Sequence, residues 1–197
     1  MALDLVALAI IDRFKAALAN QLTGVPAFPL TPDTFNVILA SPDEGAANAD
    51  LVMFLYLITP DADLRNAERI RPWPNPGDAP SRFAPAVPLE LRFLVTTGMN
   101  VPGPKGLSML AAAIRAIEAG SPLALNNAFD DAVWLSLLPL SSDEMARIWG
   151  LFPNENCRSS FAFRASPVWV EPRDPVPQAT NVSDDRFHSG SLAKAGS

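Results

Sequence analysis

Apolar residues recur near the start of the chain with the spacing of a helix. Ile10 and Phe14 belong to a stripe that follows the i, i+3, i+4, i+7 pattern. This stripe predicts an amphipathic helix over residues 3–19. Leu5 and Leu8 lie off the stripe and widen its apolar face, which indicates either a deeply packed helix or a second contact with a neighbouring subunit.

Two later segments have the signals of helices. Residues 105–119 are rich in alanine and are followed by Gly120, a common residue at a helix end. Ser141 and Glu144 form a capping-box pattern that opens a short helix over residues 142–149. The apolar side predicted for the first of these helices consists of Leu107, Leu110, Ala111, Ile114 and Ile117.

Other segments have the patterns of strands. Residues 51–58 are apolar at every position, which is typical of a central strand covered on both faces. Alternating apolar and polar positions predict further strands at 35–40, 89–96, 133–138 and 160–170. Pro167 predicts that the last of them lies at a sheet edge or contains a bulge.

The order of these elements predicts an α/β domain over residues 1–171. Its core would be a central mixed, mainly antiparallel sheet of about four to five strands, flanked by helices. Residues 67–88 contain six prolines, so we expect a long proline-rich loop there. Residues 172–197 are rich in polar residues and proline and have few large apolar residues, which predicts an extended tail that is flexible unless a partner orders it.

The proline-rich loop carries two large aromatic side chains, Trp73 and Phe83. Both would be costly to leave in water. We therefore interpret the loop as a surface arm that docks on a partner, with folding back onto the domain's own sheet as the alternative.

Composition and charge narrow the classes of partner. The chain is 49% hydrophobic and only 18% charged, against about 25% charged in a typical globular domain, which indicates either a surface that meets other proteins or simply an apolar fold. A net charge of -6 argues against nucleic acid as a partner, because phosphate binding needs clustered Lys and Arg. No run approaches the roughly 20 apolar residues that a membrane span needs, so we expect no direct membrane insertion.

The sequence offers few residues for catalysis. Cys157 is the only cysteine and His188 the only histidine, so neither an intramolecular disulfide nor a histidine-rich metal site is expected. A single cysteine also favours the reducing cytoplasm. The glycines around Lys105 resemble a phosphate-binding loop, but the lysine stands between them instead of after the second. We therefore predict no enzyme activity, no cofactor and no metal.

Paired aspartates raise one competing hypothesis, a hydrolase that uses two carboxylates. The pairs are Asp61 with Asp63, Asp130 with Asp131 and Asp184 with Asp185. Each pair stands at a predicted turn or in the tail, where aspartates usually bond the local backbone. The hydrolase hypothesis requires two carboxylates to converge in one cleft.

Five strings occur in the order found in one known family. They are Leu51-Val-Met-Phe-Leu-Tyr56, Leu64-Arg-Asn66, Pro88-Leu-Glu-Leu-Arg-Phe-Leu-Val-Thr96, Leu140-Ser-Ser-Asp-Glu-Met-Ala-Arg-Ile-Trp149 and Ser159-Ser-Phe-Ala-Phe163. With the opening helix they cover about residues 3–170, and they resemble the N-terminal domain of cap, or tube-terminator, proteins of extracellular contractile injection systems. The family often has an aromatic pair where this chain has Arg92-Phe93.

The resemblance implies a structural protein of a phage-tail-like assembly, related in architecture to phage tail terminators. It implies a hexameric ring on the baseplate-distal end of the inner tube, in contact with the last sheath layer. The implied partners are copies of this chain, the inner tube protein and the sheath protein. Assembly would take place in the bacterial cytoplasm, within a particle that is then released or membrane-anchored.

A head-to-tail ring needs two different contact patches on each subunit. The candidate interface residues are Leu5 and Leu8 on the first helix, Arg65 after the central strand, Trp73 and Phe83 in the proline-rich loop, and Arg92. Arg65 has a second interpretation, in which it bonds free carbonyls at the strand end and holds the turn. The alternative function is a small-ligand or peptide-binding module with residues 67–88 as a lid.

Overall fold

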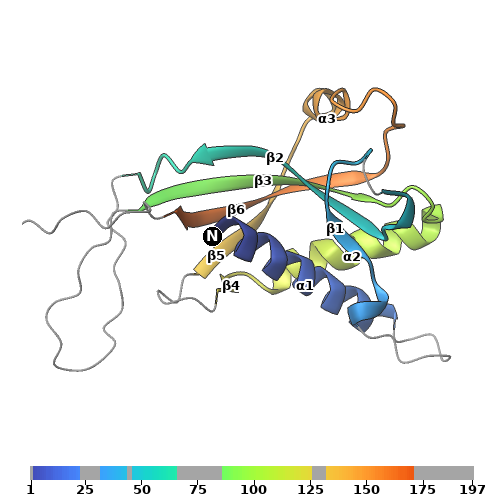
Figure 1. Ribbon diagram of the computed structural model, residues 1–197, viewed down its shortest axis with the longest axis horizontal. Helices are drawn as coiled ribbons and strands as arrows, with labels where there is room; N and C mark the ends of the chain where they lie inside the picture. The colour runs from blue at the N-terminus through green and yellow to red at the C-terminus, as the bar shows by residue number, and fades with distance from the viewer. Residues whose placement is uncertain (1, 23–31, 44–45, 66–85, 126–131, 171–197) are drawn as a thin grey trace, which may run out of the picture.

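The computed structural model describes residues 2–22, 32–43, 46–65, 86–125 and 132–170. The elements in chain order are α1 (Ala2–Leu22), η1 (Pro32–Thr34), β1 (Val37–Leu39), η2 (Ala46–Asn48), β2 (Leu51–Pro60), β3 (Val87–Thr97), α2 (Gly103–Ala119), β4 (Leu123–Ala124), β5 (Ala132–Leu138), α3 (Ser142–Trp149) and β6 (Ser160–Val170), where η is a short 3-10 helix. Figure 1 shows α1 and α2 side by side on one side of the sheet and α3 on the other.

The described strands form one sheet in the order β1-β2-β3-β6-β5-β4 (Figure 1). β1 runs parallel to β2, and every other neighbouring pair is antiparallel. This confirms the predicted α/β class and its mixed, mainly antiparallel sheet. The sequence patterns missed β4, because two residues are too few to show an alternation.

An aromatic cluster lies between the sheet and its two long helices. Phe14 of α1 meets Phe163 of β6 edge to face, with 6.0 Å between ring centroids, and Phe163 stacks on Phe93 of β3 at 5.1 Å. None of these three rings is accessible to solvent. The cluster joins α1 to the two central strands, as the amphipathic stripe of the first helix predicts.

The opposite face of the sheet is covered at one end, by α3 and the turn after it. Trp149 and Phe152 pack on Leu94 of β3. Phe152 also meets Phe54 of β2 edge to face, with 5.1 Å between centroids. A further small cluster on that face joins Val52 of β2 to Ala46 and Ala49.

β2 has the predicted two-sided burial in its first half alone. Its first three residues are fully buried. A bulge then separates Leu55 from Leu57, and the strand continues past the residues that contact α3, so that Ile58 is 46% exposed. The prediction of a strand covered on both faces is therefore wrong beyond the bulge.

β6 lies between β3 and β5, so the prediction of an edge strand from Pro167 was wrong. The other prediction, a bulge, is confirmed. The pairing of β3 with β6 shifts between Leu89↔Val168 and Leu91↔Ala165, which leaves Pro167 in the extra stretch. Since proline has no N–H to give to the ladder, a bulge accommodates it inside a central strand.

The apolar side of α2 differs from the predicted one at its start. Leu107 is 60% exposed, whereas Met109 is buried in the main core together with Ile117. Residues two apart on a helix are turned by about 200°, so Leu107 and Met109 lie on nearly opposite sides, and the predicted side was the wrong one at the start of α2.

The predicted loop and tail fall largely outside the described residues. Residues 66–85 and 171–197 are not among them, so Trp73, Phe83, the tail and the boundary after residue 171 stay predictions. The loop predicted over 67–88 overlaps the sheet, because β3 already begins at Val87.

Candidate functional site

Beyond α3, the sheet face opposite α1 and α2 carries polar side chains instead of a packed helix, within the part of the chain that the structure describes. We call this region the open face. It is formed by Glu90 and Arg92 of β3, Arg164 and Ser166 of β6, and Trp134 and Ser136 of β5. Strand alternation places them together, because their neighbours Leu91, Leu135 and Ala165 are buried against the helices.

A buried carboxylate links two cations on the open face. Glu90 is only 9% exposed. Its Oε1 is 2.6 Å from Nε of Arg92 and its Oε2 is 3.2 Å from Nη1 of Arg164. A buried charge is costly without partners, so Glu90 keeps both ion pairs. These pairs hold the two guanidinium groups in place, and the groups present a positive surface of fixed shape to solvent.

Arg92 was predicted from the sequence as an interface residue, and the structure places it at the centre of the open face. Its partners were missed. Glu90 could have been found, since it is two residues away and alternation puts it on the same side as Arg92. Arg164 lies 74 residues from Glu90 in the chain, and no local sequence signal connects the two.

A hollow of about 240 Å³ lies beside this ion network. Its lining consists of Asp61, Asp63, Leu64, Trp134, Ser136, Arg164, Ser166 and Pro167. Asp61 holds the turn that forms one wall. Its Oδ1 accepts hydrogen bonds from the backbone N–H groups of Asp63 and Leu64 at 3.1 and 3.2 Å, and its Oδ2 accepts one from the Ser166 hydroxyl.

The carboxylates in this hollow bear on the hydrolase hypothesis. Asp61 and Asp63 share the hollow, as that hypothesis requires. The hydrogen bond from Ser166, followed by those from the backbone, holds the pKa of Asp61 below its usual range. A general acid needs a raised pKa, so Asp61 is suited to holding the turn and not to donating a proton.

Arg65 stands at the end of this turn, and its side chain is exposed. Asp61, and not Arg65, forms the hydrogen bonds that hold this turn. The sequence did not predict this role for Asp61. Leu64 beside Arg65 lines the hollow. Contact of Arg65 with a partner therefore stays a prediction.

Tyr56 adds a polar group at the boundary between the open face and the α3 cluster. Its ring packs with that cluster, and its hydroxyl is buried without a hydrogen-bond partner among the described residues. Burial raises the pKa of Tyr56, and the nearby Arg92 opposes this effect. A buried hydroxyl of this kind is costly, and a partner that donates or accepts a hydrogen bond here would relieve the cost.

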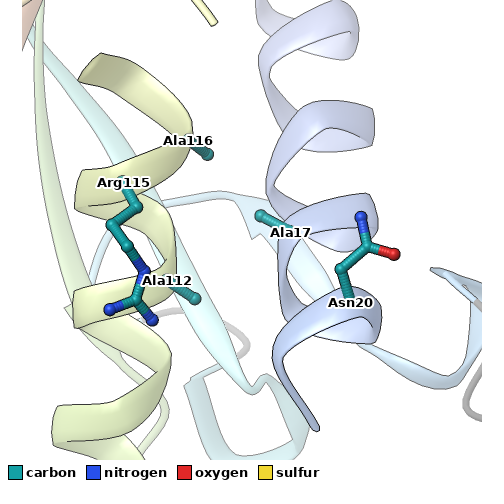
Figure 2. Close-up of a pocket in the computed structure, with 5 residues that line it drawn as sticks. All are labelled: Ala17, Asn20, Ala112, Arg115 and Ala116. Carbon is teal, nitrogen blue, oxygen red and sulfur yellow. The ribbon is translucent and has the colours of Figure 1, made fainter. Parts of the chain in front are cut away.

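The second candidate surface is a groove between α1 and α2. Figure 2 shows Ala17 of α1 directed toward Ala112 and Ala116 of α2, and Asn20 and Arg115 complete the lining. The groove has a volume of about 340 Å³. Because alanines line most of it, the two helix backbones approach closely and leave little chemistry beyond one amide and one guanidinium group.

Leu5 and Leu8, also predicted interface residues, lie nearer the start of α1. They are 43% and 57% exposed, so the interpretation of them as deeply packed is wrong. Arg13 shows how the helices are set, because its guanidinium group lies against Gly120 at the end of α2. Ala17, further along α1, shares the groove with Ala112 and Ala116, which come earlier in α2. The two helices are therefore antiparallel, and Leu5 and Leu8 lie beyond the end of α2.

The hydrogen bond between Ser166 and Asp61 supports a testable prediction. We expect Ser166→Ala to raise the pKa of Asp61 toward its usual range, because it removes the largest cause of the lowered value. A lowered carboxylate pKa stabilises the fold at pH values above the unfolded-state pKa, and this stabilisation is lost as the pH falls through the folded-state value. The variant should therefore lose less stability than the parent on acidification.

Carbon-13 NMR titration of the Asp61 carboxyl group checks this, with urea unfolding at neutral and acid pH. Ser136→Ala is the matched control, since Ser136 lines the same hollow and the hydroxyl that bonds Asp61 is that of Ser166. An unchanged Asp61 pKa in Ser166→Ala would contradict the assignment.

Among the described residues, no cluster of three or more His, Cys, Asp or Glu side chains is placed to hold a metal ion. Among the same residues, no helix has the length and apolar character needed to cross a membrane.

Comparison with known proteins adds a family and a shared fold. Residues 6–184 match the family model described as the Pvc16 N-terminal domain. The sheath/tube terminator of PVC, an extracellular contractile injection system, in its extended state is 18% identical, with a TM-score of 0.51 over 92% of this chain. The tube-terminating cap of the anti-feeding prophage is 19% identical, with a TM-score of 0.55 over 87% of this chain.

The chain spans 64% and 58% of the lengths of these two solved chains. No curated protein matches it in sequence. At identities this low, the likeness to these two structures shows a shared fold.

Proposed function

The chain belongs to the Pvc16 N-terminal domain family, and on that premise we propose that it is a structural cap subunit of a phage-tail-like contractile injection system. The observation that supports this best is the family match over residues 6–184. The same fold occurs in a sheath/tube terminator and in a tube-terminating cap. The cap would end the inner tube and have no catalytic role.

The finer proposal is a hexameric ring at the baseplate-distal end of the tube, in contact with the last sheath layer. Such a ring is a closed head-to-tail assembly and needs different patches on its subunits. The exposed Leu5 and Leu8 on α1 and the open face around Arg92 supply two surfaces of different chemistry. One is apolar and the other is charged, so they suit different neighbours in a tube-and-sheath assembly.

The alternative, a small-ligand or peptide-binding module, has less support. The hollow on the open face measures about 240 Å³, which is below the roughly 300 Å³ at the lower end of small-molecule sites. The groove between α1 and α2 is larger but is lined mainly by alanine. The lid of that alternative, over residues 67–88, falls mostly outside the described residues.

The mass of the purified protein in solution tests the proposal, followed by negative-stain imaging with inner tubes of the same system. We expect a ring-sized species that binds at one end of each tube. The double variant Leu5→Asp with Leu8→Asp should weaken ring formation or tube binding without unfolding the domain, because both side chains are exposed. Leu107→Asp is the matched control, since Leu107 is equally exposed on the other long helix.

A stable monomer that ignores tube ends would contradict the cap function. Retention of full assembly by the Leu5 and Leu8 variant would remove these two residues from the proposed interface and leave the function itself intact.

A further inference from the structure

The β1 strand has one side of its backbone unpaired among the described residues. The Ala40 N–H donates to Met53 O, and the Leu51 N–H donates to Asn36 O. Residues 36, 38 and 40 therefore turn their backbone groups toward β2, and by alternation Val37 and Leu39 turn theirs outward. No backbone hydrogen bond within the described ranges reaches these outward groups.

The β5 strand has a second open edge, near the opposite side of the sheet. β4 pairs only with its first two residues. The Leu135 N–H donates to Ser121 Oγ at 3.0 Å, so Leu135 faces away from β6, and alternation gives Leu137 the same direction. The Leu137 N–H and C=O are thus open on the outer side of the strand, again among the described residues.

Neither open edge carries a charged residue or proline inside the strand, although β1 is only three residues long and Pro139 follows β5 directly. Natural edge strands are commonly guarded by charged residues or proline. Val37–Leu39 and Ala132–Leu138 contain neither. At both edges the leucine that turns outward is exposed, to 46% at Leu39 and 37% at Leu137. These edges have the properties of strands that add to another sheet.

We propose that β1 of one copy of the chain pairs antiparallel with β5 of the next copy, so that the sheet continues from subunit to subunit. This proposal rests on the proposed ring function and says how the ring closes. Leu39 of one copy would lie opposite Leu137 of the next, and the two exchange N–H and C=O hydrogen bonds.

Strand direction agrees with this pairing. β6 runs in the same direction as β1 and β2, and β3 and β5 run the opposite way. A head-to-tail ring whose axis follows the strands keeps these directions in every copy. β1 of one copy then meets β5 of the next in the antiparallel sense, in which a short pair can form regular hydrogen bonds.

The faces of the sheet agree as well. Leu39 pairs with Met53 of the helix-covered face, and Leu137 pairs with Phe163 of the same face. Residues directly opposite in an antiparallel pair put their side chains on one side. Joining the two edges therefore keeps α1 and α2 of all copies on one side of the shared sheet. If either leucine belonged to the other face of the sheet, the helices of neighbouring copies would lie on opposite sides.

The exposed residues select the register. With Leu39 opposite Leu137, the two exposed leucines cover each other, and both free N–H groups find acceptors. A shift by two residues would place Leu39 opposite Leu135, whose side chain is buried and whose N–H is already bonded to Ser121. A second copy is a better occupant than an unrelated strand, because each chain brings both matching edges.

Leu39→Pro and Leu137→Pro test the pairing. Each proline removes an N–H that points outward, so the sheet inside each subunit keeps its hydrogen bonds. We expect each variant alone to stay monomeric while the wild type forms rings. A 1:1 mixture should form heterodimers and nothing larger, because the intact β5 edge of one variant pairs with the intact β1 edge of the other and both edges left over carry proline. Leu39→Ala and Leu137→Ala are the matched controls, since they keep the N–H, and they should assemble better than the proline variants.

A disulfide test gives an independent result in the Cys157→Ser background. Chains with Leu39→Cys and chains with Leu137→Cys should link to each other on oxidation and not to themselves, which gel electrophoresis reports as a band of twice the mass. Rings that persist in both proline variants, or a proline variant that dimerises with itself, would overturn the pairing and leave the cap function standing. A wild type that neither forms rings nor binds tube ends, while the cysteine chains still link, would count against the cap function alone.

Discussion

Phe163→Ala is expected to lower the free energy of unfolding by about 3–5 kcal/mol, the usual cost of removing a fully buried aromatic ring. Phe163 is 0% exposed, stacks on Phe93 at 5.1 Å between centroids and meets Phe14 edge to face at 6.0 Å. Its loss removes contacts to α1 and to β3 together. The two rings around it come from two separate elements, α1 and β3, so they cannot collapse readily into the cavity.

Urea unfolding followed by circular dichroism measures this effect, with the slope of the transition as a check on compactness. Leu107→Ala serves as the control and should change the stability by less than about 0.5 kcal/mol, because Leu107 is 60% exposed. Equal stability losses in the two variants would show that the helices and the sheet do not pack around Phe163.

Gly98→Ala should have the second largest effect, a destabilisation of about 3 kcal/mol at the upper end of the usual overpacking cost. Gly98 follows β3 and packs against η2 and the start of β2, where its N–H donates to Asp50 O at 3.1 Å. A Cβ atom at this position would lie 1.7 Å from the Ala49 carbonyl oxygen. The obstructing atoms are backbone, so they cannot swing aside as a side chain would.

Gly103→Ala makes a matched control with the opposite sign. Nothing lies within 4 Å of a Cβ atom at Gly103, which begins α2. Alanine there should be neutral or should stabilise the helix by up to about 1 kcal/mol. Thermal unfolding of both variants gives the comparison, and a Gly98→Ala protein that melts as the parent does would exclude the close approach of β3 to Ala49.

The parts of the fold that depend on local spacing could be read from the sequence. The capping box of α3 is an example, because Ser141 and Glu144 are three residues apart and bond each other's backbone N–H groups. The strands predicted at 51–58 and 89–96 lie within β2 and β3 for the same reason. Alternation and capping act over a few residues and leave a readable pattern.

The order of the strands could not be read in this way. β3 and β6 pair across more than sixty intervening residues, and no periodicity reports such a partner. Pro167 indicated an edge as one possibility, because a missing N–H fits either an edge strand or a bulge. The bulge that accommodates it depends on both neighbouring strands.

The candidate site was predicted in part. Arg92 lies on the open face, and Leu5 and Leu8 are exposed on α1. The partners of Arg92 and the role of Asp61 in the turn were missed. These contacts join side chains from distant parts of the chain, such as Asp61 with Ser166, so that they exist only once the sheet is complete.

The position of β6 also affects how the domain folds. β6 follows all the other described strands in the chain, yet it lies between β3 and β5. During synthesis β3 and β5 must therefore leave the ribosome before the strand that joins them exists. Until then each offers a bare strand edge to other chains. The aromatic stack between Phe93 and Phe163 forms only at this last step, so docking of β6 both completes the core and removes two sites of aggregation.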